Sequence, residues 1–584
     1  MGRFNLIDDP WIEVLLDKKG SRKLVSLRQI FEKSADYIDI CGDMHIQDFA
    51  VMRLVLAIMH TVFSRYDIDG NSYEYLKIND KMQQLEKVDE DNYESYMDDL
   101  LDTWENIWKM GKFPQIIIDY LECWKDSFYL YDDKRPFYQV TDEYMSLDKI
   151  KGKTIGQISG KNINRTITES DNKVALFAPK SANENNKEIL TNDEIARWLI
   201  TFQSYTGLAD KTVYGKEKYK RRNSKGWLYD LGAIFFKGSD LFETLMLNFV
   251  IYNKTADEYT YNIQKPAWEL TDDELINFYL DFEKNIDNIA GLYTAYSRAL
   301  FIDPNHKQEE PFSMKLIKLP EVNHADNFLE PMTLFKYNNT GENKGQFTPK
   351  KHPANQSMWR YFGQIKMSYE NYESENIDAK SRKPGIIDWF DEISEIVDLE
   401  IISLVALSLE DDGNATSWVP INEIYDRMNM NLDVFVDDLG EGWIFRINKM
   451  VDYTKKIVGG IYGGFLKDIE AIRNLKKSDF AKNKVEQMYA IIDKPFRDMI
   501  EAINKEDSMI DTEGKWKSDL NHLIYREAKK IFEEAGASDY TMKQIVSKDK
   551  DSKEKKEPAN IATAFNKLCA ILYKYGKEVD DGKK

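Results

Sequence analysis

"FYLYDDKRPFYQV", residues 128–140, places aromatic and aliphatic side chains on both sides of a short polar stretch. Asp132 and Asp133 favour a turn because an aspartate side chain accepts hydrogen bonds from the backbone that follows it. Pro136 adds a fixed φ that suits a turn. The segment therefore predicts a structural turn, and the rest of the chain has to show whether it is an ordinary hairpin between two core strands or part of a known scaffold.

Length and charge limit the classes of protein to consider. With 584 residues the chain is too long for one hydrophobic core, so two to four domains are expected. A hydrophobic fraction of 42% is typical of a globular protein. The net charge of −20 argues against a protein that coats nucleic acid with its whole surface. A local basic surface could still bind nucleic acid, because salt limits the reach of each charge to about 10 Å.

Cysteine usage and hydropathy predict a soluble cytoplasmic protein without membrane contact. Cys41, Cys123 and Cys569 are far apart and form no CxxC motif, so neither a disulfide framework nor a zinc site is expected. The N-terminal segment carries acids where a signal peptide needs an apolar run. The longest strongly apolar stretch, residues 401–409, is far shorter than the ~20 residues of a membrane span.

The pattern of apolar residues predicts an α+β fold with a mixed α/β domain at 1–430 and a helical bundle at 431–584. Thr191 and Glu194 are placed as a capping box for a helix that Gly207 would stop. Before residue 430 we expect strands at 9–17, 22–31, 226–238 (a pair or one bent strand) and 398–410, and helices at 46–63, 95–127, 191–207 and 239–252.

Four amphipathic segments after residue 430 predict an antiparallel four-helix bundle. The last of them is expected to begin at Pro558 and to end at Gly576. The charged insert at 547–557 is expected to be a solvated, mobile connection. The four segments lie at 443–475, 484–504, 521–537 and 558–576.

The sequence contains no recognised catalytic motif. It has no GxxxxGK[ST] phosphate loop, no HExxH and no GxSxG. Acidic runs at 89–92 and 410–412 could bind Mg²⁺ in principle, but in so acidic a chain they favour a solvated surface. No cofactor and no metal site is expected. The six histidines are isolated from one another in sequence and are interpreted as surface or core residues: His45, His60, His306, His324, His352 and His522.

One segment departs from the acidic composition. "KTVYGKEKYKRRNSKG", residues 211–226, carries seven Lys or Arg and one Glu. Basic side chains contact phosphates, and Tyr214 or Tyr219 could stack on unpaired bases. A solvated loop that balances acidic neighbours explains the same residues equally well. The lysines and arginines that would contact a DNA backbone are Lys216, Lys218, Lys220, Arg221 and Arg222.

Several segments in order resemble the CasA family, the large subunit of the type I-E CRISPR Cascade complex. The helical C-terminus is also similar to that family's four-helix bundle. The resemblance covers nearly the whole chain, and it implies that residues 128–140 are a hairpin of that family's scaffold. The segments are "FNLIDDPWIEVLL" (4–16), "FYLYDDKRPFYQV" (128–140), "ALFAPKSAN" (175–183), "EIARWLITFQSYTGLADK" (194–211), "GSDLFETLMLNFV" (238–250) and "QKPAWE" (264–269).

The resemblance implies a non-catalytic DNA-recognition subunit. Its partners would be a double-stranded DNA target, a guide-RNA ribonucleoprotein with the other Cascade subunits, and a trans-acting helicase-nuclease. It would read a short motif beside the target (the PAM), help to open the duplex and dock the nuclease. Base pairing with the guide RNA would read the rest of the target, as in another RNA-guided effector.

The resemblance also implies candidate site residues. A guide RNA contact loop falls at Leu176, Phe177 and Ala178. The glycine-rich loop that reads DNA in the family maps onto four residues of which only Gly207 is glycine, which puts backbone-only readout in question. The PAM and DNA candidates are Gly207, Leu208, Ala209, Asp210, Lys211, Lys315 and Lys318. A strand-separating wedge falls at Gly413, Asn414, Ala415 and Thr416.

Two alternatives from other classes stay open. One is a metal-dependent nuclease or hydrolase that uses the acidic clusters. The other is a helical scaffold protein without a role in nucleic-acid binding, in which the basic segment at 211–226 has no ligand.

Overall fold

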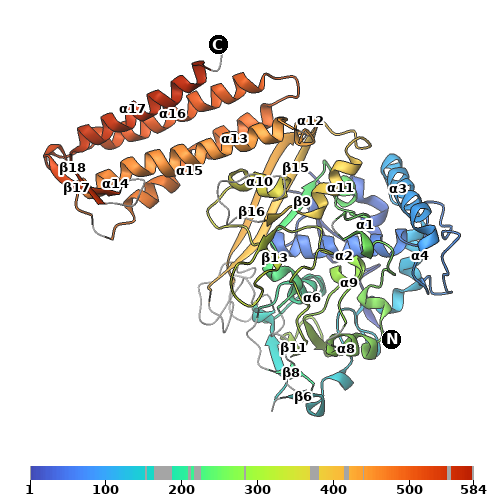
Figure 1. The fold of residues 1–584 in the computed structure, drawn as a ribbon. Helices are drawn as coiled ribbons and strands as arrows, with labels where there is room; N and C mark the ends of the chain where they lie inside the picture. Colours follow the sequence, from blue (N-terminus) through green and yellow to red (C-terminus); the bar gives the residue numbers. More distant parts are fainter. Residues whose placement is uncertain are drawn as a thin grey trace. The chain divides into compact units, whose positions relative to one another are not determined.

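The computed structural model describes residues 2–581 except for 152–153, 164–186, 208–211, 216–224, 255, 282–283, 369–380, 414–419, 439, 476 and 549–553. The chain divides into two compact units, which are described separately (Figure 1). Unit 1 contains residues 1–354, 367–398 and 404–427, and unit 2 contains 355–366, 399–403 and 428–584. Short sheets and helices make up unit 1, and long helices dominate unit 2, which confirms the α+β class.

The first sheet of unit 1 forms where the sequence predicts strands. β2 (Ile12–Leu15) pairs antiparallel with both β3 (Arg22–Val25) and β4 (Asp39–Ile40). The second half of the strand expected at 22–31 is instead α1 (Leu27–Lys33). Ser26 and Gln29 explain the difference, because they form a capping box that starts a helix at this point.

The segment at 128–140 contains the predicted turn but not the predicted hairpin. The Asp132 carboxylate accepts hydrogen bonds from the backbone N–H groups of Lys134 and Arg135, at 2.7 and 2.9 Å. The strand before this turn, β5 (Tyr129–Tyr131), pairs with β1 (Arg3–Asn5), and residues 136–140 form no strand.

Gln139 explains why the chain after the turn is not a strand. Its side-chain amide donates to the Leu130 carbonyl at 2.8 Å and its Oε1 accepts from the Ile302 backbone N–H at 2.8 Å. One buried side chain thus joins the turn to β10 (Arg298–Ile302), in place of a ladder of backbone hydrogen bonds.

The core of unit 1 surrounds α2 (His45–Phe63), the predicted helix at 46–63. Of the described helices α2 alone is long and apolar enough to cross a membrane, and 94% of its most apolar window is buried inside the protein. It is therefore a longer apolar segment than the stretch at 401–409 on which the sequence argument rested. Core burial accounts for its composition, because a helix that is apolar all round is a buried one.

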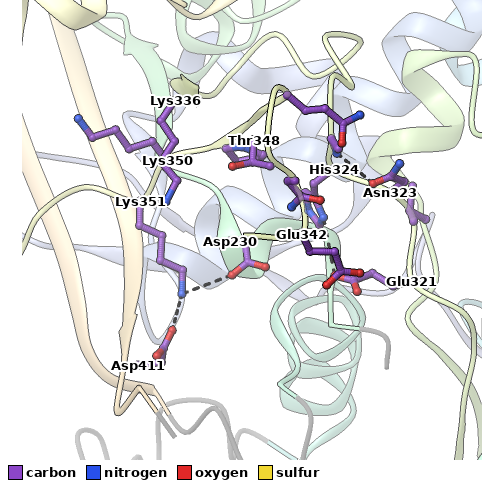
Figure 2. A pocket seen from close by; sticks show the side chains of 15 residues that line it. Asp230, Glu321, Asn323, His324, Lys336, Glu342, Thr348, Lys350, Lys351 and Asp411 are labelled. Carbon is purple, nitrogen blue, oxygen red and sulfur yellow. Dashed lines mark hydrogen bonds and ion pairs between the residues drawn. The ribbon is translucent and has the colours of Figure 1, made fainter. Parts of the chain in front are cut away.

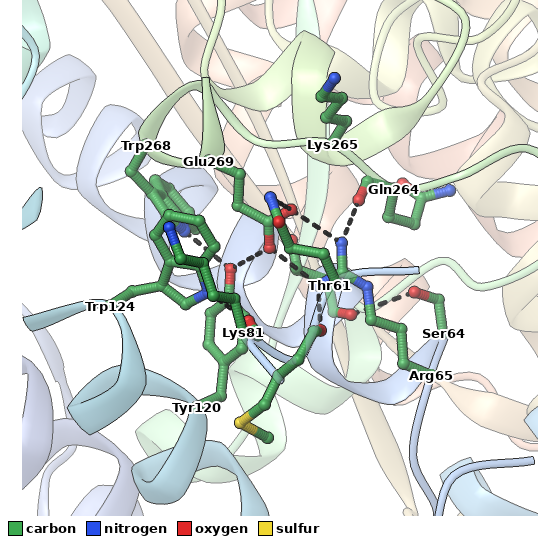
Figure 3. A network of polar contacts seen from close by, with 12 residues as sticks. Thr61, Ser64, Arg65, Lys81, Tyr120, Trp124, Gln264, Lys265, Trp268 and Glu269 are labelled. Atoms are coloured by element: carbon green, nitrogen blue, oxygen red, sulfur yellow. Dashed lines mark hydrogen bonds and ion pairs between the residues drawn. The ribbon is translucent and has the colours of Figure 1, made fainter. Parts of the chain in front are cut away.

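Arg53 in α2 and Arg65, two residues after its end, make buried ion pairs. Arg53 contacts Glu330, with Nη1 to Oε1 at 2.6 Å, and Arg65 contacts Glu269, with Nη1 to Oε1 at 2.7 Å. Tyr120 also donates to Glu269 and accepts from the Trp268 indole, at 2.7 and 2.8 Å. Figure 3 shows this second network, which gives the "QKPAWE" segment a structural role.

The helices around α2 follow the sequence expectations closely. The helical region at 95–127 is α3 (Tyr93–Met110) and α4 (Ile116–Cys123). The helix at 191–207 is α6 (Asn192–Tyr205), and Thr191 and Glu194 form the predicted capping box. It ends before Gly207, because Thr206 is already extended at φ −64° and ψ 142°.

Residues 226–252 contain one strand rather than a pair. Residues Trp227–Asp230 form a 3₁₀ turn, η7, which precedes β9 (Ala233–Lys237) and α7 (Leu241–Leu247). β9 lies beside β15 (Ile401–Asp411), the predicted strand at 398–410, which in turn lies beside β16 (Pro420–Asn431).

The remaining elements of unit 1 are short. They include a five-stranded sheet in which β11 (Ser313–Lys318) is central and a three-stranded sheet around β12 (Phe335–Tyr337). The other strands and helices are β6 (Ile150–Lys151), β7 (Gly156–Ser159), β8 (Val213–Tyr214), β13 (Phe347–Pro349), β14 (Ser381–Arg382), α8 (Asp272–Leu280), α9 (Ile289–Tyr293) and α11 (Gly385–Ile393).

Unit 2 contains the predicted four helical segments. The first is continuous, because a π-helical stretch, Lys456–Tyr462, joins α13 (Trp443–Lys455) to α14 (Gly463–Ile472). The others are α15 (Phe480–Ala502), α16 (Met509–Glu533) and α17 (Ile561–Asp581). Short helices α10 (Phe362–Lys366) and α12 (Leu432–Phe435) also belong to this unit.

The end of the bundle differs from the sequence expectation. The described ends of the charged insert belong to a hairpin, because β17 (Lys543–Lys548) pairs antiparallel with β18 (Glu554–Ala559), and residues 549–553 lie outside the described residues. Ile545 and Ala559, only 4% and 7% exposed, anchor it. Pro558 therefore lies in β18, and α17 begins three residues later and continues past Gly576.

Candidate nucleic-acid interface

The five-stranded sheet brings together two candidate regions: the strand that carries Lys315 and Lys318, and the chain that follows Gly207. β11 pairs antiparallel with β10 and with β7, and its last residue, Lys318, lies opposite Val213 of β8. The stretch that begins at Gly207 leads into β8, so the chain on both sides of residues 208–211 is fixed at this sheet.

Buried groups hold both ends of the predicted DNA-reading loop. The Arg298 guanidinium donates to the Gly207 carbonyl at 2.6 Å. Thr212 donates through its hydroxyl to the Thr154 carbonyl at 2.7 Å, and its own carbonyl accepts from the Lys318 backbone N–H at 3.0 Å. Leu208, Ala209, Asp210 and Lys211, the loop between these anchors, lie outside the described residues.

The two lysines of β11 differ in accessibility. The Lys315 side chain is 45% exposed, lies over the Phe301 ring and contacts the Asp142 carboxylate at 2.8 Å. Lys318 is only 2% exposed. Because its side chain cannot reach a DNA groove from there, the prediction for Lys318 is wrong, and Lys315 is the candidate that the structure leaves accessible.

The basic segment is described only at its two ends. Tyr214 is 4% exposed, so the suggestion that its ring stacks on bases is wrong. Lys225 forms an ion pair with Asp230 of η7. The five backbone-contact candidates, Lys216, Lys218, Lys220, Arg221 and Arg222, lie outside the described residues, as do Tyr219 and the guide-contact candidates Leu176, Phe177 and Ala178.

The predicted wedge lies at the turn of a long two-stranded ribbon. Ser403 faces Asn429 and Glu410 faces Asn422, so β15 and β16 run antiparallel (Figure 1). Gly413 begins the turn with φ +65°, a conformation that glycine adopts without strain. Asn414, Ala415 and Thr416, the rest of the predicted wedge, lie outside the described residues.

Asp411, the last residue of β15, fixes the start of that turn. Its carboxylate accepts from the Gly413 backbone N–H at 2.9 Å and contacts the Lys351 ammonium at 2.8 Å. Lys351 also lies 3.8 Å from Asp230. The turn is therefore connected to η7 through one lysine.

A pocket of about 720 Å³ lies beside this lysine (Figure 2). Asp230, Glu321 and His324, all on its lining, bring their possible ligand atoms within 4.8 Å of one another. From sequence, His324 is interpreted as a surface or core residue, and Asp230 and Glu321 are not considered as ligands. The spacing of Glu321 and His324, three residues apart, is the one signal that could have suggested them, and Asp230 comes from a distant segment.

Comparison with known proteins places this fold in a class. A family model described as CRISPR-associated protein Cse1 matches residues 5–529. The structure is similar to Cse1 of Thermobifida fusca, with a TM-score of 0.71 and 20% identity over 99% of this chain and 98% of that one. It is also similar to a chain of a CRISPR RNA-guided surveillance complex, with a TM-score of 0.65 and 14% identity over 98% of this chain and 100% of that one.

A sequence relative carries the same family name. CRISPR-associated protein CasA/Cse1 of Thermus thermophilus is 27% identical over 273 residues, which are 46% of this chain and 42% of that protein. The match thus spans less than half the length of this relative. Because the family model covers most of the sequence, the chain belongs to the CRISPR-associated Cse1 (CasA) family.

Proposed function

We propose that this chain is the large subunit of an RNA-guided CRISPR surveillance complex, with the guide RNA and the other Cascade subunits as its partners in the cytoplasm. The match to the Cse1 family model over residues 5–529 carries this proposal. Similarity over 98% of the chain to a protein from a CRISPR RNA-guided surveillance complex supports it.

Within such a complex the subunit reads the PAM in double-stranded DNA, helps to open the duplex and docks the trans-acting helicase-nuclease. Three features support a DNA-facing role: accessible Lys315, the anchored ends of the loop at 208–211, and the ribbon turn that starts at Gly413. The net charge of −20 fits local contacts better than a general affinity for nucleic acid.

The proposed subunit is not itself a nuclease. The sequence has no recognised catalytic motif, and cutting would be left to the docked helicase-nuclease. Carboxylates also line the pocket beside Lys351, so the alternative of a metal-dependent nuclease needs a direct test. Purified chain with Mg²⁺ or Mn²⁺ should leave labelled single- and double-stranded DNA intact, and cleavage that purifies with the chain would contradict this part of the proposal.

Co-expression tests the assembly itself. The tagged chain, expressed with the genes that surround it and a repeat array, should co-purify with a small RNA and with further subunits in constant proportions. Nuclease treatment of the RNA before purification should separate the further subunits from the captured chain. If the chain elutes alone and without RNA from these cells, the proposed function is wrong.

A further inference from the structure

Two segments of unit 1 that are far apart in sequence bring a metal-ligand set together. Asp230 is the last residue of η7, and Glu321 and His324 lie in the chain just after β11. Their carboxylate and imidazole atoms lie within 4.8 Å of one another, on the wall of the 720 Å³ pocket (Figure 2). None of these three side chains is among the candidate DNA contacts.

The His324 imidazole is held in the tautomer that a metal requires. Its Nε2 lies 3.0 Å from the Trp227 carbonyl oxygen, which can only accept, so Nε2 carries the hydrogen. In the neutral ring the lone pair is then on Nδ1, the atom that lies 3.8 Å from Glu321 Oε1. Histidines that bind metals generally donate their other N–H to a carbonyl or carboxylate in this way.

Trp227 is itself fixed from the core. Its ring stacks on His324 with 4.1 Å between centroids and 4° between planes. Its indole N–H donates to Glu330 at 2.7 Å, and Glu330 is the buried partner of Arg53. The orientation of His324 therefore depends on a buried ion pair, which is a stiffer support than a surface loop provides.

Burial and charge suit a cation at the open side of the cluster. The side chains of His324 and Glu321 are 11% and 13% exposed, whereas Asp230 is 32% exposed toward the pocket. Lys225 and Lys351 both lie beside the Asp230 carboxylate, the Lys351 ammonium at 3.8 Å. A bound cation would replace Lys225 and Lys351 as the counter-charge of Asp230.

We propose that Asp230, Glu321 and His324 bind one transition-metal cation of the Zn²⁺ type, with water in the remaining coordination position. An imidazole ligand favours Zn²⁺ over Mg²⁺ or Ca²⁺, which prefer oxygen ligands alone. Three protein ligands leave tetrahedral zinc one open position. The cation would join η7 to the chain after β11, beside the lysine that contacts the ribbon turn at Asp411.

Metal titration of the full chain tests this site. Protein treated with EDTA and dialysed should bind one Zn²⁺ by calorimetry, and Co²⁺ should give a visible absorption band from the same site. Glu321→Gln, which keeps the side-chain shape, and His324→Asn should each weaken Zn²⁺ binding by about 10-fold or more. Lys351→Met should tighten it, because it removes a competing positive charge.

The controls make the result specific. His522→Asn removes an exposed histidine of α16 and should leave both the affinity and the Co²⁺ spectrum unchanged. Circular dichroism reports whether each variant folds, and Glu321→Gln gives the answer if His324→Asn does not fold. The proposal is overturned if the original chain binds no Zn²⁺ at 1:1, or if Glu321→Gln binds it as tightly as the original chain.

Discussion

The Arg53–Glu330 pair connects the core helix to the candidate sites, because Glu330 also accepts from the Trp227 indole. Both charged side chains are almost completely buried, at 1% and 0% exposure. Burial alone would raise the pKa of Glu330, but the Arg53 guanidinium outweighs it and holds that pKa below its usual value. The pair therefore stabilises the fold at neutral pH only while both partners are present.

Arg53→Met should lower the free energy of unfolding at pH 7 by about 3–5 kcal/mol, because it leaves an uncompensated buried carboxylate. Adding Glu330→Gln to this variant should recover part of the loss. In the original chain the contribution of Glu330 is complete above its unfolded pKa of about 4.3 and is lost as the pH falls through the lower folded value. Without Arg53, burial raises the pKa of Glu330. The difference in free energy of unfolding between the original chain and Arg53→Met, measured by urea unfolding, should therefore be smaller at pH 5 than at pH 7.

A surface pair gives the matched control. Lys77 and Glu86 are 67% and 64% exposed and lie in the same unit, so Lys77→Met should cost no more than about 1 kcal/mol. An Arg53→Met variant as stable as Lys77→Met, or a loss that does not change between pH 5 and 7, would show that the buried pair has no such role.

Accessibility of single side chains is what the sequence could not predict. Lys318 and Tyr214 fit a DNA-binding pattern by residue type, yet both are buried by pairing between β11 and β8, strands about 100 residues apart. His324 looked isolated for the same reason, since its partner Asp230 comes from another segment. Local patterns contain no information about such long-range neighbours.

Local chemistry predicted the helices of the protein better than its short strands. α2 and α6 follow from apolar periodicity and, for α6, from the capping box at Thr191. The hairpin of β17 and β18 was missed because lysines and glutamates dominate it, and among its described side chains Ile545 and Ala559 are the buried hydrophobic ones. Likewise β5 pairs with β1, 125 residues or so before it, and not with the adjacent chain.

The ribbon of β15 and β16 carries the prediction about strand separation. On the hypothesis that its turn props open the first base pairs, Asn414→Ala combined with Thr416→Ala should slow formation of the RNA–DNA hybrid. Each base-pair step costs about 1–2 kcal/mol to open, so a 5- to 30-fold slower rate is expected on fully paired duplex. On a duplex already mismatched beside the PAM, the rate should change little.

Asn422→Ala provides a control on the same ribbon, because Asn422 is an exposed residue of β16 away from the turn. It should leave hybrid formation unchanged on both duplexes. If the double variant is slowed equally on paired and mismatched duplex, the substitutions affect a step after strand opening. If it is slowed on neither duplex, these residues do not form the wedge.

For the molecule as a whole, the order of several weak motifs indicated the family before any single residue could indicate the function. The family model then matched residues 5–529, while the loops that would touch DNA or guide RNA lie largely outside the described residues. Sequence and structure together therefore define the scaffold of the candidate interface. Its contacts with DNA and guide RNA are for experiment to define.

Selection of PAM sequences tests the central claim, that this subunit gives the complex its recognition of DNA beside the target. The RNA-guided complex, assembled with and without this chain, would be incubated with duplexes that share one target and carry a randomised flank, and the bound duplexes would be sequenced. With the chain present, a small set of flanking sequences should be enriched, and without it the enrichment should disappear. The same enriched flanks in both assemblies would contradict the account, because recognition would then belong to another subunit.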